Sequence, residues 1–169
     1  GGLRLHGPLN EAALQAALDR IMQLHEVLRT HFALVDGQPV QRPVDHARFT
    51  LIRHDLSNMA DPEAQIAHLN EVEAEEPFDL RTGPLIRGRL LRLDEQTHVL
   101  LLTLHHIVSD GWSMGVLIHE LGTLYRAYAS DRLAYSIDPL PPLALQYADY
   151  AIWQRQSMDE QTQRQHLQY

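Results

Sequence analysis

The sequence predicts an α/β or α+β fold in which a sheet carries helices on one face. Some segments place apolar residues at the alternating four- and three-residue steps of an amphipathic helix, as the residues from Leu14 to Leu28 do. Others alternate, or run apolar, over about four to eight residues between turn residues, which is typical of strands. The two kinds interleave along the 169 residues without a repeat or a low-complexity tract. This order favours helices packed on a sheet.

Turn residues bound the expected strands. A hairpin over Thr30–Val44 turns at Asp36–Gly37, a residue pair that favours tight hairpins. Further strands are expected at 3–6, 48–53, 85–93 and 97–104, the last two as a second hairpin. Because the strand Thr97–Leu104 is apolar on both faces, we expect it to be central in the sheet and covered on both sides.

Capping residues mark the expected helices. Asn10 is a favourable N-cap for a helix over Glu11–His25, and Asp61–Pro62 opens a second helix that reaches Glu76. Two more helices are expected at 113–129 and 145–156, with a loop at 77–84 and a proline-rich linker at 137–142. The tail continues a helical pattern without a terminating Gly or Pro, so we interpret the chain as a piece of a longer polypeptide.

Composition excludes several classes of protein. A net charge of −8 argues against a nucleic-acid surface, which needs a basic stripe to displace counterions. The longest apolar run, Val99–Leu102, is too short to span a membrane, and no signal peptide is apparent. The absence of cysteine excludes disulfides, thiolate zinc sites and cysteine nucleophiles, and makes the cytoplasm the expected location.

The segment HHIVSDG at 105–111 is the most unusual local feature and holds the candidate functional residues. Side chains alternate between the faces of a strand, so the imidazoles of His105 and His106 should point in opposite directions. One is then structural, while the other is a candidate catalytic group. An imidazole with an unperturbed pKa of about 6.5 is suited to taking a proton near neutral pH. A buried histidine pair without a catalytic role is the plain alternative.

Two other interpretations of this region stay open. His106 and Asp110 could approach one metal ion, although no further ligands follow at a recognisable spacing. The segment GWSMG at 111–115 matches the nucleophile elbow of a serine hydrolase, with Ser113 as the nucleophile. Such an enzyme needs a histidine after the serine, and only His119 and His166 follow. We therefore favour Ser113 as an N-cap of the next helix.

Four segments, in order, resemble the condensation domains of nonribosomal peptide synthetases. LHHIVSDGWSMG is similar to the HHxxxDG signature, and LHEVLRTHF at 24–32 to the segment RHExLRTxF. PFDLRTGPLIRGRLLRL at 77–93 and YADYAIWQRQ at 147–156 resemble two further segments of the family. Leu24 departs from the pattern, because the family usually has arginine there.

The resemblance implies a chloramphenicol-acetyltransferase-like half, a two-layer α/β sandwich with a mixed sheet covered by helices. Residues 1–169 would form the N-terminal lobe of a condensation domain, whose first motif and C-terminal lobe are absent from this sequence. The family transfers a donor acyl or peptidyl group to the amino group of an acceptor aminoacyl thioester. Both substrates are carried on the phosphopantetheine of carrier-protein domains, so no directly bound cofactor and no metal is expected. HHIVSDGWSMGVL resembles the subtype with an L-configured donor and acceptor.

The resemblance also assigns roles to residues. His106 is implied to be catalytic, and His105 to be a packed structural histidine. Asp110 is implied to be structural through an ion pair with an arginine, for which Arg29 is the natural partner once Leu24 has replaced the usual one. Gly111 would let the phosphopantetheine arm approach the backbone. Trp112 is expected to cover the core.

The implied partners are donor and acceptor carrier domains, the C-terminal lobe of the same domain and an adjacent adenylation domain. An alternative to catalysis is that this lobe recognises a carrier domain without turning over a substrate.

Overall fold

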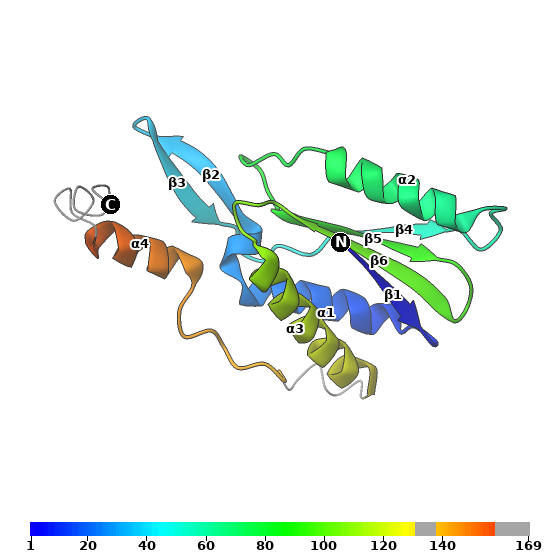
Figure 1. The fold of residues 1–169 in the computed structure, drawn as a ribbon. Helices are drawn as coiled ribbons and strands as arrows, with labels where there is room; N and C mark the ends of the chain where they lie inside the picture. The colour runs from blue at the N-terminus through cyan, green and yellow to red at the C-terminus, as the bar shows by residue number, and fades with distance from the viewer. Residues whose placement is uncertain (131–137, 158–169) are drawn as a thin grey trace, which may run out of the picture.

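The computed structural model describes residues 1–130 and 138–157 and shows a four-stranded mixed sheet (Figure 1). The strand order is β1 (Gly2–His6), β6 (Thr97–Leu104), β5 (Ile86–Arg92) and β4 (Leu51–Asp55). Strands β4 and β5 are parallel, whereas the other two pairings are antiparallel. A separate hairpin joins β2 (Thr30–Val35) to β3 (Gln38–Pro43). The α/β class with a mixed sheet, predicted from the sequence, is confirmed.

Helices cover both faces of this sheet (Figure 1). Helices α1 (Glu11–Leu24) and α3 (Gly111–Ser130) pack against one face, and α2 (Pro62–Glu75) packs against the other. The sequence predicts helices on one face only. This prediction is wrong, because α2 forms a third layer on the other face. Helix α2 is the crossover between the parallel strands β4 and β5, a connection that must pass over one face of the sheet.

Strand β6 explains why two helical layers are needed. Leu100 and Leu102 are buried in the cluster with α1 and α3, whereas Val99 and Leu101 are buried in the cluster with α2. Both faces of the strand must therefore be kept from water. The expectation that Thr97–Leu104 is central and covered on both sides is confirmed.

Local signals set the ends of several elements. The Asn10 side chain accepts a hydrogen bond from the Ala13 N–H at 3.1 Å, and the Asp61 side chain caps α2 in the same way. At the β2–β3 turn, Asp36 and Gly37 have φ values of 52° and 76°, as a tight hairpin requires. These three predictions are confirmed, while the strand expected at 48–53 is found at Leu51–Asp55.

The C-terminal helix α4 (Tyr147–Ser157) follows an irregular stretch over 138–146. The Gln146 side chain donates to the Leu24 carbonyl at 3.0 Å and accepts from the Glu26 N–H at 3.2 Å. These bonds hold the start of α4 to the end of α1 and to the short helix η1 (Glu26–Arg29). Position 137 of the expected linker lies outside the described residues. Within the described part, no helix is long and apolar enough to cross a membrane.

Candidate functional site

The candidate site lies in the turn that joins the central strand β6 to helix α3. Strand β6 ends at Leu104, and the helix begins at Gly111. The six residues between them carry both histidines and Asp110. A central strand and a helix of 20 residues thus fix both ends of the turn.

His105 is held on the side of the sheet that α2 covers. Its backbone N–H donates to the Leu85 carbonyl at 3.0 Å, which extends the pairing with β5. Its Nδ1 accepts from the Ile107 N–H at 3.0 Å. The ring meets Phe78 edge to face, with 5.7 Å between centroids and 89° between planes. This packing suits the structural role that the resemblance implies, and that role stays a prediction.

His106 has different surroundings. Its side chain is exposed and lines a cavity of about 370 Å³. The end of β6, the turn and the first turn of α3 form the rest of the wall, including Leu102, Asp110, Gly111 and Met114. Within the described part of the chain, no hydrogen bond involves its imidazole. The two histidines therefore face different environments, as the sequence predicts, although the turn, and not strand alternation, separates them.

Asp110 is the N-cap of α3. Its Oδ1 accepts from the Ser113 N–H at 2.8 Å and from the Ser113 hydroxyl at 2.6 Å. The Ser113 Oγ in turn accepts from the Asp110 N–H at 3.3 Å, which completes a reciprocal capping box. The hydroxyl and then the backbone N–H of Ser113 lower the pKa of Asp110. The N-cap is thus Asp110, and the prediction that placed it at Ser113 is wrong by three residues.

The predicted ion pair between Asp110 and Arg29 is not present. Arg29 is buried at the end of η1, where its Nε donates to the Met22 carbonyl at 3.1 Å and its Nη1 to the Val44 carbonyl at 2.8 Å. Its nearest carboxylate is that of Glu26, at 3.5 Å. Each residue instead bonds to partners close to it, and the structural role implied for both stays a prediction. Arg29 ties α1 to the end of β3, whereas Asp110 starts α3.

The serine-hydrolase interpretation finds no support in the geometry. The hydrogen-bond partner of the Ser113 hydroxyl is the Asp110 carboxylate, and no histidine bonds to it within the described ranges. His119 lies on the same helix, and His166 lies outside the described residues. The same ranges contain no cluster of three or more His, Asp or Glu residues that could hold a metal ion.

Two further predictions concern the first residues of α3. Trp112 is 82% exposed, so the expectation that it covers the core is wrong. A helix presents about a third of its residues to the core, and position 112 lies on the outer side of the first turn. At Gly111 a Cβ would meet nothing within 4 Å. The space beside this backbone is open, and approach of a phosphopantetheine arm stays a prediction.

A buried charge cluster next to the site was not predicted from the sequence. The Glu73 carboxylate is 2% exposed and bonds to the Nε atoms of both Arg87 and Arg89. Arg89 also lies 3.3 Å from the Nε2 of His54, and burial and then Arg89 lower the pKa of that histidine. A signal was present, because Glu73 follows Leu69 by four residues on the buried side of α2.

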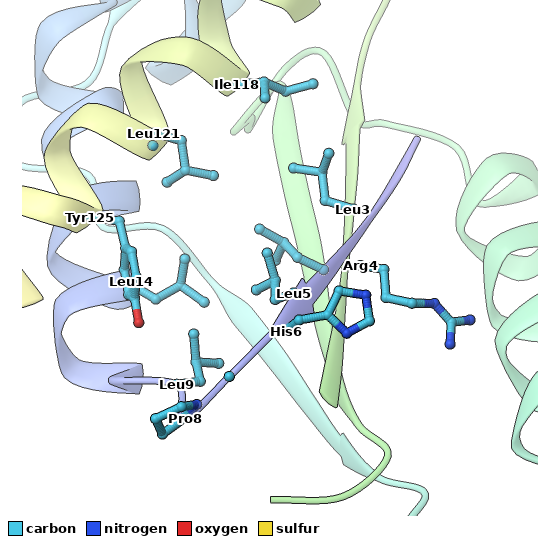
Figure 2. A pocket seen from close by; sticks show the side chains of 13 residues that line it. Leu3, Arg4, Leu5, His6, Pro8, Leu9, Leu14, Ile118, Leu121 and Tyr125 are labelled. Carbon is cyan, nitrogen blue, oxygen red and sulfur yellow. The ribbon is translucent and has the colours of Figure 1, made fainter. Parts of the chain in front are cut away.

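A second cavity of about 370 Å³ lies between β1, α1 and α3 (Figure 2). Its wall is mostly apolar, with Leu3, Leu5 and Leu121 facing inward (Figure 2). The Tyr125 hydroxyl already accepts the Asn10 N–H at 3.1 Å. This cavity shares no lining residue with the one at His106, although it also has an exposed histidine, His6, on its wall.

Comparisons with known proteins agree on one family. A family model described as "Condensation domain" matches residues 2–169. The chain is 48% identical over 160 residues to malpibaldin synthetase from Mortierella alpina, which covers 94% of this chain and 3% of that protein. Among solved structures, the X-domain from teicoplanin biosynthesis is similar with a TM-score of 0.77 and 37% identity, over 92% of this chain and 32% of that one.

A solved first condensation domain of the calcium-dependent antibiotic synthetase, in complex with a substrate analogue, is also similar. Its TM-score is 0.69 at 29% identity, over 76% of this chain and 32% of that one. The chain thus spans 3% of the curated relative and about a third of each of the two solved chains.

Proposed function

The chain belongs to the condensation domain family, and from this we propose that residues 1–169 form the N-terminal lobe of a domain that makes amide bonds on carrier proteins. The family implies acyltransferase chemistry on thioesters held by phosphopantetheine. In this reaction the amine of the acceptor aminoacyl thioester attacks the carbonyl carbon of the donor thioester. A C–N bond forms, the C–S bond breaks and the donor arm leaves as a thiol.

His106 is the proposed catalytic residue. The observation that carries the proposal is its exposed imidazole, without a hydrogen-bond partner in the described residues, on the wall of a cavity of about 370 Å³. An acceptor α-ammonium group with a pKa of about 8 must lose a proton before it attacks, and a mild base is sufficient for that. The same imidazole can orient the amine or stabilise the tetrahedral intermediate.

The other residues of the turn would place this imidazole. The His105 ring bonds to the Ile107 N–H, and Asp110 begins the helix that follows the turn. Gly111 leaves open space on the cavity wall beside His106, where the phosphopantetheine arm would pass. We assign no ligand contact to Arg29, because its guanidinium is buried against the Met22 and Val44 carbonyls.

The proposed partners follow from the family. They are the donor and acceptor carrier domains, the C-terminal lobe that would close the cavity and a neighbouring adenylation domain. The L-configured donor and acceptor are proposed from the likeness of HHIVSDGWSMGVL to that subtype. Recognition of a carrier domain by this lobe alone remains the alternative without catalysis.

The test is His106→Ala in the complete condensation domain that contains this chain. With loaded donor and acceptor carriers, dipeptidyl-thioester formation should fall by at least about 100-fold, as expected for loss of a general base or a positioning group. Carrier docking, measured by titration, should be unchanged. His119→Ala removes an exposed histidine from α3 and should leave turnover intact. Full turnover by His106→Ala would exclude the catalytic assignment.

A further inference from the structure

Phe78 lies between a buried charge cluster and the first histidine of the candidate site. The Arg87 guanidinium carbon lies 4.1 Å from the centre of its ring. The His105 ring meets Phe78 edge to face at 5.7 Å between centroids. One aromatic side chain from the loop at 77–84 therefore contacts both a cation on β5 and the imidazole that precedes His106.

The cation under Phe78 is held from several directions. Arg87 bonds to the buried Glu73 carboxylate and donates from Nη2 to the Glu73 carbonyl at 2.7 Å. It also donates to the carbonyls of Glu76 and Pro77 at the C-terminal end of α2. These bonds hold the guanidinium at the C-terminal end of α2, so it gives the Phe78 ring a fixed packing surface.

The His105 ring, packed against Phe78, also bonds to the backbone of the turn. Its Nδ1 accepts the Ile107 N–H at 3.0 Å, so the neutral ring carries its proton on Nε2. The bond closes a short loop around His106, whose backbone lies between the two bonded residues. Rotation of the His105 ring would break this bond and release the peptide units on both sides of His106.

We propose that Phe78 is a positioning residue for His106, which it holds through the His105 ring and the Ile107 N–H. This rests on the proposed function, because it assumes that the His106 imidazole acts on the substrate. Phe78 does not line the cavity, so its effect is expected on the rate of the chemical step and not on carrier affinity. A displacement of about 1 Å at a reacting group costs on the order of 100-fold in rate.

The experiment compares Phe78→Leu, Phe78→Tyr and the unchanged sequence in the complete condensation domain. Phe78→Leu removes both ring contacts and should lower kcat by about 10- to 100-fold with KM for the loaded carriers unchanged. Phe78→Tyr keeps the ring and should stay within about threefold of the unchanged domain. In the ¹⁵N spectrum of the imidazoles, His105 should show its proton on Nε2, and Phe78→Leu should shift it towards a mixture of tautomers.

Phe49→Leu is the matched control, because Phe49 is 3% exposed in the cluster on the other face of the sheet. It should lower the melting temperature, yet leave kcat and the His105 spectrum as they are. An unchanged kcat or an unchanged His105 spectrum in Phe78→Leu would overturn the proposal, as would equal losses in Phe78→Leu and Phe78→Tyr. The spectrum is read without substrate, so it reports on the positioning contacts even if His106→Ala proves active.

Discussion

Removal of the charge on Glu73 is expected to destabilise the α2 side of the sheet. The Glu73 side chain is 2% exposed, and its two partners Arg87 and Arg89 are 19% and 11% exposed. Glu73→Gln keeps the shape of the side chain and leaves two largely buried guanidinium groups without their shared anion. Loss of one partner from a buried ion pair costs about 3–5 kcal/mol, and we expect the free energy of unfolding to fall by that amount.

Glu76→Gln supplies the matched control. Glu76 contacts the same Arg89 at 3.3 Å, but its side chain is 53% exposed. An exposed pair contributes about 0–1 kcal/mol, so the control should differ little from the unchanged domain. Urea unfolding of the complete domain, followed by circular dichroism, gives both values. Equal losses for Glu73→Gln and Glu76→Gln would refute the argument that burial of the cluster makes its charge balance matter.

Two further predictions follow from the contacts of the turn and of β4. Asp110→Ala and Arg29→Ala should each lower the melting temperature, and their effects should add, because no bond joins the two residues. A double variant whose melting temperature falls by clearly less than the sum of the two single losses would show that the residues form an ion pair after all. His54 has a pKa lowered by burial and then by Arg89, so the folded state takes up a proton less readily than the unfolded chain, and stability should fall as the pH drops below about 6.5. His54→Gln should reduce the drop in melting temperature between about pH 7.5 and about pH 5.5, and an undiminished drop would contradict this assignment.

The parts of the fold that were predictable from the sequence depend on local chemistry. Asn10 and Asp61 cap helices with their own side chains, and the Asp36–Gly37 turn needs nothing beyond its backbone angles. The apolar pattern of Thr97–Leu104 correctly indicated a central strand. In each case the prediction depends on contacts between residues a few positions apart, or on the apolar pattern of a single segment.

One group of errors concerns residues that have both near and distant candidate partners. The resemblance suggests Arg29 as the partner of Asp110, but Ser113 lies three residues away and supplies both hydrogen bonds to its carboxylate. Arg29 in turn bonds to the carbonyls of Met22 and Val44, which a charge-based argument does not consider. The contact between Phe78 and His105 could not be predicted either, because it requires the loop at 77–84 to lie beside the end of β6.

The antiparallel pairing of β1 with β6 has a consequence for the order in which the chain is assembled. Gly2 pairs with Leu101, so about a hundred residues must be synthesised before the first strand meets its neighbour. At about 5–20 residues per second, a ribosome needs roughly 5–20 s for that length. During this interval β1 lacks its β6 partner. The hairpin β2–β3 and the β5–β6 pair close over much shorter loops, so we expect β5 and β6 to pair early and β1 to dock on β6 late.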